Sequence, residues 1–576
     1  MSRPIRRPQA APAPDLHPMI AGEHAPPITD PALADFAHFS FWVESSFNGG
    51  PGEGFNGYDR DAHRYHRSYI NPRSYRLQLD ARLGLMHGPA NIALARNVPD
   101  RPAFTSIDDF VDLVGTLTQV RGGIGGGGGG RGGRMVPDDL VAYVWVVTGE
   151  DGALLASHVI QRPFTPMYIA HADLPGEGTY EIWLRVVFSD NRQGERRARF
   201  RLRDWFIVSL GDSAASGEGN PDMVGTIGLG GGTVCEGVTT ASIARDWEPQ
   251  MSNEPVWIER EAHRSMRSGP ALAALAVQQA QGSTLSGPGT VTLDKVVFAS
   301  FARSGADITD GLISAQQHPD DYIGVGQLEE CRRTAASRRI DALMISIGGN
   351  DIGFSGVLTD LVRGDLPDSV WNVAFSGNDA AARQAVADRL DRLLGVGLPA
   401  GQPGELEVRF NTLRREVDAL RQDPGVDEVY ISGYPTAPFS NRDANGDLEF
   451  RSCGIFLGPD LSISVGDNAV LESRGQQLND LIRRKAEEFG WHYVDVADEF
   501  QGHGYCSSDD STFWVRAEES CRRQGDFRGT MHPNYRGHAV YALALATALR
   551  EHTFVPPRRP GPERPVVLLP GAIARP

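Results

Sequence analysis

After residue 203, short apolar runs alternate along the chain with longer, more polar segments. Runs of this kind are typical of strands that are buried on both faces of a parallel sheet. Five of them stand out, at Trp205–Leu210, Lys295–Ser300, Ala342–Gly348, Glu428–Ser432 and Trp491–Val496.

Two of the intervening segments have the period of an amphipathic helix. In FNTLRREVDALRQ the apolar residues that share one helical face are Phe410, Leu413, Val417 and Leu420. In QQLNDLIRRKAEEFG they are Leu478, Leu481, Ile482 and Phe489, and Gly490 marks the end of the helix. Strands that alternate with helices predict a three-layer α/β domain with a five-stranded parallel sheet over residues 204–552.

Residues 36–203 have a different pattern, with short β-type runs separated by turn signals such as GEDG and PGEG. In TYEIWLRVVF, Tyr180, Ile182 and Leu184 alternate onto one face. This pattern predicts a smaller, immunoglobulin-like antiparallel sandwich. We expect a disordered arm at residues 1–35, a flexible glycine-rich loop at 121–134 and a proline-rich tail at 553–576, because their compositions disfavour a packed core.

Composition narrows the classes of partner. The formal net charge is -17, which argues against nucleic acid or an anionic membrane as a partner, since both require a basic face. No run of about 18 apolar residues is present, so we expect no transmembrane helix. The first 19 residues contain arginines without a following apolar stretch, so no secretory signal peptide is visible.

Polar residues that suit acyl transfer follow the apolar runs. Ser213 comes directly after the first run, Gly305 after the second and Asn350 after the third, and His532 precedes a helical segment beyond the fifth. Sites in parallel sheets form where the strands end. We therefore expect these residues to meet there as a nucleophile, a general base and donors to a developing oxyanion. The alternative for Ser213 is a helix N-cap, a position that serine favours.

The motifs GDSAASGEG, GGND and HPNYRGH, with a lone glycine after the second strand, resemble the SGNH (GDSL-like) serine hydrolases in residue type and order. The stretch QGDFRGTMHPNYRGH, the upstream HGYC and the segment from Trp257 to HRS are similar to the bacterial lipase/esterase branch. The resemblance covers about residues 205–550 and implies a flavodoxin-like fold without a metal or cofactor. It also slightly favours an exported protein.

The resemblance assigns roles to individual residues. Ser213 is the implied nucleophile and His532 its general base. The backbone N–H groups of Ser213 and Gly305, with the side-chain amide of Asn350, are the implied oxyanion donors.

The sequence departs from the family where many members have an aspartate, three residues before the histidine, because that residue is Gly529. A backbone carbonyl of Gly529 or Thr530 is one replacement, which gives a Ser-His dyad, and Asp526 is the other. We favour the carbonyl, because six residues is an awkward reach around a tight turn.

Other residues receive structural interpretations. We interpret His538 as packing or capping within its helix and His263 as structural or pocket-lining. The sequence RDANGDLE around Asp443 predicts a hairpin turn rather than a calcium loop. Among the five cysteines we favour a Cys506–Cys521 disulfide, because the two residues close one short loop.

Three functions remain open. The first is a serine-dependent carboxylic ester hydrolase, a lipase, esterase or phospholipase, acting through an acyl-enzyme on a lipid or small-molecule ester. The second removes acetyl groups from polysaccharide with the same residues, and the sandwich then contacts the glycan or a cell surface. The third is a catalytically inactive binding or adhesion protein.

Overall fold

The computed structural model describes the sheets, the helices and the connections that place them. The described residues are 40–43, 57–81, 140–161, 168–189, 193–227, 251–279, 283–284, 290–316, 324–353, 388, 390–399, 401–451, 453, 465–508 and 511–554. The expected arm at 1–35, the glycine-rich loop at 121–134 and all but two residues of the tail at 553–576 lie outside them.

Each of the five apolar runs contributes to a strand of one mixed, eight-stranded sheet. The strands are β9 (Gln193–Gly211), β13 (Thr290–Ser300), β14 (Ile340–Ser346), β15 (Val426–Ser432) and β18 (His492–Val494). Neighbouring strands pair in parallel in the order β13-β9-β14-β15-β18. Their carboxyl ends therefore meet at one edge.

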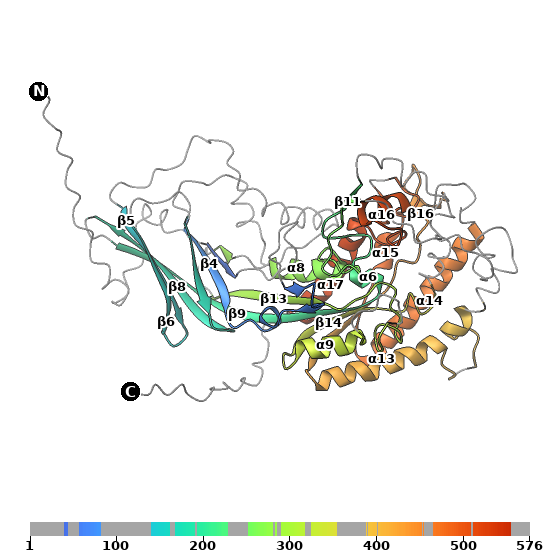
Figure 1. The fold of residues 1–576 in the computed structure, drawn as a ribbon, viewed down its shortest axis with the longest axis horizontal. Helices are drawn as coiled ribbons and strands as arrows, with labels where there is room; N and C mark the ends of the chain where they lie inside the picture. The colour runs from blue at the N-terminus through green and yellow to red at the C-terminus, as the bar shows by residue number, and fades with distance from the viewer. Residues whose placement is uncertain are drawn as a thin grey trace, which may run out of the picture.

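The same sheet continues beyond β9 with three antiparallel strands, β8 (Gly178–Phe188), β5 (Leu140–Gly149) and β6 (Leu154–Gln161). Figure 1 shows the long β9 running from this part into the part surrounded by helices. The expected boundary between residues 203 and 204 thus falls inside one strand. The prediction of a separate five-stranded sheet was wrong in this respect, because β9 belongs to both parts.

A second sheet packs against the antiparallel part. It consists of β12 (Ser283–Thr284), β1 (Ser40–Val43), β4 (Tyr75–Ala81) and β7 (Tyr168–Leu174). Leu77 and Leu79 of β4 join Tyr180, Ile182 and Leu184 of β8 in one buried cluster. The predicted inward face of β8 is therefore confirmed, whereas the immunoglobulin-like classification stays a prediction.

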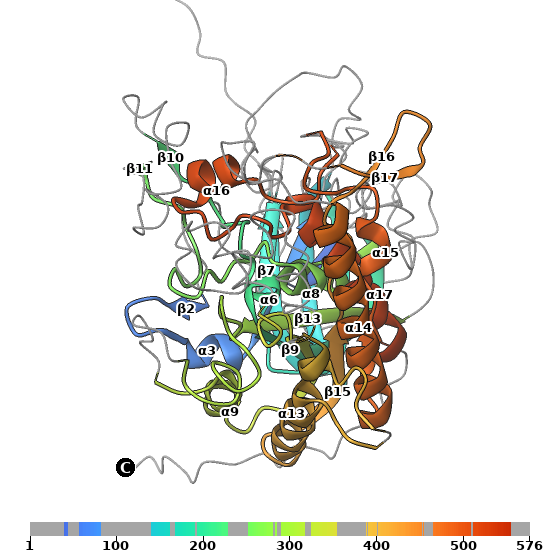
Figure 2. The ribbon, with the colours of Figure 1, turned by 90° about the vertical axis from the view of Figure 1, so that its right-hand side faces the viewer.

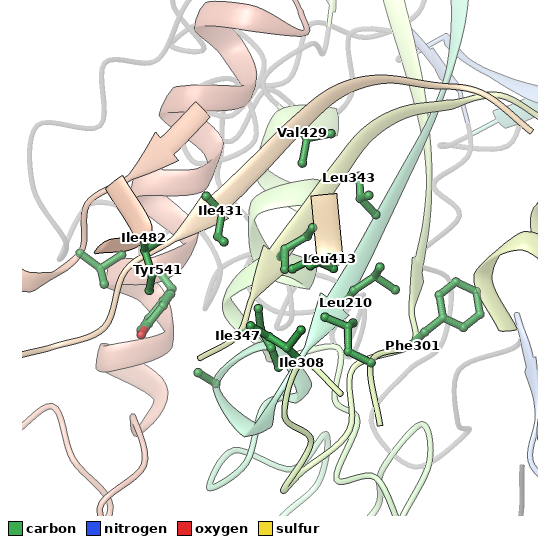
Figure 3. Packing of buried hydrophobic residues seen from close by; sticks show 14 of the residues in the cluster. Leu210, Phe301, Ile308, Leu343, Ile347, Leu413, Val429, Ile431, Ile482 and Tyr541 are labelled. Atoms are coloured by element: carbon green, nitrogen blue, oxygen red, sulfur yellow. The ribbon is translucent and has the colours of Figure 1, made fainter. Parts of the chain in front are cut away.

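Helices cover both faces of the parallel part, which gives the three layers (Figures 1 and 2). Phe206, Val208 and Leu210 of β9 point to a core shared with α9 (Gln327–Ala335), α13 (Glu405–Gln422) and α14 (Val465–Phe489). Figure 3 shows part of this core around Leu210 and Leu413. Trp205 and Ile207 point the opposite way, to α8 (Gly269–Gln279) and α17 (Tyr535–His552). The predicted faces of α13 and α14 are buried as expected, and α14 ends at Phe489.

Shorter elements complete the described chain: β2 (Tyr58–Asp59), β3 (Arg64–Tyr65), α3 (Arg67–Ile70), α6 (Ser213–Ser216), β10 (Thr226–Ile227), β11 (Met251–Asn253), β16 (Ser440–Arg442), β17 (Leu448–Phe450), α15 (Ala497–Phe500) and α16 (Ala517–Gln524). The segment around Asp443 is the turn of the β16–β17 hairpin, as predicted. Within the described chain, none of the helices has the length and apolar character that crossing a bilayer requires.

The cysteine pairing differs from the prediction. Cys506 is bonded to Cys453, 53 residues earlier in the chain, with a Cα–Cα distance of 5.7 Å. Cys521 is disulfide-bonded as well, and Cys331 is a buried free thiol. The Cys506–Cys521 prediction was wrong because closeness along the chain was used in place of closeness in the fold.

Candidate active site

Ser213 begins the short helix α6 directly after β9 ends at Gly211. The residue that caps this helix is Asp212, whose side chain accepts a hydrogen bond from the N–H of Ala214 at 3.1 Å. The N-cap alternative for Ser213 is therefore wrong. The Ser213 hydroxyl is not used as the cap of α6.

Gly211 allows β9 to end in close contact with Ser346 of β14. An ideal Cβ on it would lie 2.0 Å from the Ser346 carbonyl oxygen, and its φ of +137° disfavours other residues. The Gln327 side chain pairs with both the N–H and the C=O of Gly211 at 2.8 Å. The N–H of Asp212 donates to Ser346 O at 2.9 Å. The turn that carries Ser213 is thus held by β14 and by the first residue of α9.

His532 lies in a turn that is fixed on both sides. Its carbonyl accepts from the N–H of Val515 at 2.8 Å, and its own N–H donates to Gly529 O at 3.1 Å. Two residues later, the Asn534 side chain caps α17 by accepting from the N–H groups of Arg536 and Gly537. The imidazole is therefore positioned by backbone contacts and by a helix cap.

The His532 Nε2 atom lies 2.9 Å from Ser213 Oγ, and its Nδ1 lies 3.2 Å from the carbonyl oxygen of Thr530. Because a carbonyl oxygen only accepts, Nδ1 carries the hydrogen and Nε2 presents its lone pair to the serine. Burial lowers the pKa of His532 below its ordinary value, against the opposing charge of Glu218. The imidazole is therefore neutral near pH 7 and able to accept a proton.

The three groups considered as support for the histidine have different contacts. The Thr530 carbonyl faces Nδ1, whereas the Gly529 carbonyl accepts the backbone N–H of His532. Asp526 is turned to other partners: it accepts from Gln524 Nε2 at 2.9 Å and from the N–H of Arg528 at 2.8 Å. Its other oxygen lies 3.5 Å from His263 Nε2.

The loops of Gly305 and Asn350 lie against each other. Asn350 Nδ2 donates to Ala306 O at 2.8 Å, and the neighbouring Asp351 accepts from the N–H of Ile308 at 3.1 Å. Gly305 has a φ of +80°. Among the described residues, the backbone N–H groups of Ser213 and Gly305 donate to no other backbone group.

A buried aspartate, Asp212, directly precedes Ser213. Burial raises the pKa of Asp212 to about 7. Its second oxygen accepts a hydrogen bond from the Tyr434 hydroxyl, and the Tyr434 ring also packs against Gly349. Tyr434 thus links the turn of Ser213 to the loop that carries Asn350.

Sequence reasoning missed a buried polar cluster behind the site. Glu218, within the GDSAASGEG motif, contacts His263 at 2.6 Å and Gln524. A lone carboxylate between two glycines, five residues after Ser213, was the signal in the sequence. His538 is fully buried and accepts from the N–H of Gly269 at 3.3 Å, in agreement with its packing interpretation.

Comparison with known proteins identifies one family. The model of the GDSL-like Lipase/Acylhydrolase family matches residues 209–540, which is more than half of the chain and includes every site residue named above. No curated protein matches the sequence.

Several solved structures are similar at low identity. The extracellular lipase of Streptomyces rimosus is 20% identical, with a TM-score of 0.34, and the likeness covers 60% of this chain and 99% of that one. Phospholipase A1 of Streptomyces albidoflavus NA297 is 20% identical, with a TM-score of 0.33, over 60% and 98% of the two chains. A mutant of the acetylxylan esterase Axe2 of Geobacillus stearothermophilus is 14% identical, with a TM-score of 0.24, over 60% and 93%.

Proposed function

Because the chain belongs to the GDSL-like Lipase/Acylhydrolase family, we propose that it hydrolyses carboxylic esters with Ser213 as nucleophile and His532 as general base. The observation that carries the proposal is the 2.9 Å contact between His532 Nε2 and Ser213 Oγ. That contact has the length expected for a nucleophile and its base. The Thr530 carbonyl supplies the orienting contact that an aspartate gives in a triad.

The reaction proceeds in two halves. Ser213 Oγ attacks the ester carbonyl carbon while its proton passes to His532 Nε2, and the carbonyl oxygen becomes an oxyanion. The N–H groups of Ser213 and Gly305 and the Asn350 amide stabilise that charge. His532 then returns the proton to the departing alkoxide, which leaves an acyl-serine. Water gives a proton to His532 Nε2 as it attacks the acyl carbon. The bond from that carbon to Ser213 Oγ then breaks and His532 returns the proton to Oγ, which releases the carboxylic acid and restores the serine hydroxyl.

The test compares wild type with Ser213→Ala and His532→Ala on a panel of p-nitrophenyl esters of increasing chain length, phospholipid vesicles and acetylated xylan. Ser473→Ala is the matched control, because Ser473 is exposed on α14. We expect turnover in wild type and in the control and a loss of at least about a thousandfold in both site variants. Full activity in Ser213→Ala would refute the proposal.

The same panel of esters also distinguishes between the three candidate functions. Turnover of long-chain or phospholipid esters supports a lipase or phospholipase. Turnover confined to acetyl esters supports a polysaccharide O-acetyl esterase, in which the antiparallel part contacts the glycan. Folded wild type without turnover of any ester supports a binding protein.

A further inference from the structure

Glu218 is a fully buried carboxylate on the loop that follows α6. His263 Nδ1 lies 2.6 Å from one of its oxygens, and Gln524 Nε2 donates to the other. Burial by itself disfavours the charged form of Glu218, but the charge of His263 and its hydrogen bond hold the pKa of Glu218 well below its ordinary value. The side chain is therefore a fixed negative charge in the interior.

His263 is held in place by several contacts. Its ring stacks on Trp257 at 4.8 Å between centroids, and its φ of +47° is unusual for a residue other than glycine. Burial by itself lowers the pKa of His263, yet the charges of Glu218 and Asp526 leave that pKa raised. No group of three or more His, Cys, Asp or Glu side chains among the described residues is placed to bind a metal ion. The contacts of His263 with the carboxylates of Glu218, at 2.6 Å, and Asp526, at 3.5 Å, make the cluster an ion-pair network.

The backbone of the Glu218 loop contacts both the turn that carries Ser213 and the turn that carries His532. The N–H of Glu218 donates to Ser213 O at 3.2 Å. A Cβ on the next residue, Gly219, would lie 3.4 Å from Pro533 O and 3.5 Å from Gly529 O, which flank His532 in the chain. The N–H of Gly219 also donates to Gln524 Oε1 at 2.9 Å. Gln524 thus joins the Glu218 loop to the segment that leads to His532.

We propose that Glu218 is the charge-balancing carboxylate of this site, which stabilises protonated His532 electrostatically while the Thr530 carbonyl orients the ring. The proposal rests on the proposed function. A triad aspartate normally both orients the imidazole and balances the charge that it gains in the transition state. A carbonyl oxygen orients the ring and carries no charge, so the second task falls to another group. Glu218 is a buried, ionised carboxylate on a loop packed against the His532 turn, and it is suited to that task.

The other charged and titratable groups around His532 act differently. The charge of His263 opposes the protonation of His532, and its effect is smaller than that of Glu218. Burial lowers the pKa of His538 in α17 to about 4, so its imidazole is neutral at the pH values at which the esterase is assayed. Burial raises the pKa of Asp526, whose contacts are with Gln524, Arg528 and His263. A hydrogen bond between His532 and the backbone of Arg528 raises the pKa of His532.

The test is the pH profile of kcat/KM for wild type, Glu218→Gln and Asp526→Asn, followed at the isosbestic wavelength of p-nitrophenol. Loss of the Glu218 charge destabilises the protonated form of His532. The acid limb of the kcat/KM profile of Glu218→Gln is therefore expected to move to lower pH by about half a unit to one unit. The kcat/KM plateau of Glu218→Gln is expected to fall about three- to tenfold, because His532 becomes a weaker base and accepts the serine proton less readily. Asp526→Asn is the matched control, since it neutralises another carboxylate of the cluster, and its acid limb stays within about 0.2 units.

A lower plateau with an unmoved acid limb in Glu218→Gln would mean a purely structural role and would overturn the proposal. An equal shift in Asp526→Asn would overturn the assignment to Glu218. Glu218→Asp keeps the charge and is expected to retain the wild-type acid limb. A shift of about one unit in the acid limb of Glu218→Asp would also overturn the proposal. This variant therefore tests the proposal even if Glu218→Gln fails to fold. Absence of esterase activity in wild type would instead refute the proposed function.

Discussion

Replacing Gly211 with alanine tests how the nucleophile is positioned. The new Cβ would lie 2.0 Å from Ser346 O, whereas a comfortable contact needs about 3.5 Å, so β9 and β14 must separate locally by roughly 1.5 Å. That movement disturbs the Asp212-to-Ser346 hydrogen bond, and alanine is strained at a φ of +137°. Together these effects are expected to reduce the free energy of unfolding by about 3–5 kcal/mol.

The effect on catalysis is separate from the effect on stability. A displacement of about 1 Å between reacting groups typically costs about a hundredfold in rate, so kcat of folded Gly211→Ala is expected to fall at least that far. The assays are urea unfolding followed by tryptophan fluorescence, and ester turnover below the unfolding transition.

The matched control is Gly446→Ala in the β16–β17 turn. Gly446 also has a positive φ, of +89°, but a Cβ there would meet nothing within 4 Å. We expect a loss of about 1 kcal/mol and wild-type kcat in the control. If Gly211→Ala were as stable and as active as Gly446→Ala, the close approach of β9 and β14 would not be what positions Ser213.

Other expectations test the remaining parts of the site. Asn350→Ala removes one oxyanion donor and is expected to lower kcat about a hundredfold with little change in KM, as measured by steady-state kinetics; an unchanged kcat would exclude that role. Asn534→Ala removes the cap of α17 and is expected to lower the free energy of unfolding by about 1–2 kcal/mol in urea titrations, whereas wild-type stability would contradict the cap. Because burial lowers the pKa of His532 and the base works in its neutral form, activity is expected to rise with pH through a midpoint below about 6.5; a midpoint clearly above that value would contradict the neutral, buried imidazole.

Periodicity predicted the parallel strands and the principal helices, because each has a burial pattern that its apolar residues report directly. The continuation of β9 was not predicted. Its first part alternates buried Ala198, Phe200 and Leu202 with exposed arginines, whereas Trp205–Leu210 is buried throughout. The change of pattern marks where helices begin to cover the second face of the same strand, and it was interpreted as a domain boundary.

The order of the motifs predicted that Ser213 and His532 would meet at the sheet edge, and His532 Nε2 lies 2.9 Å from Ser213 Oγ. The roles of Gly305 and Asn350 at that edge stay a prediction. The support of His532 could not be decided from spacing. Asp526 is in reach along the chain, but its carboxylate is engaged by Gln524, Arg528 and His263 in the fold. The partner of Cys506 was missed for the same reason, since Cys453 is distant in sequence and adjacent in space.

The proposed activation of Ser213 by His532 can be measured by treating the folded protein with a fluorophosphonate and locating the adduct by peptide mass spectrometry. We expect one stoichiometric adduct on Ser213, its loss in Ser213→Ala, and labelling at least about a thousandfold slower in His532→Ala. An unlabelled wild type, or equal labelling of Ser213→Ala, would contradict the proposed activation.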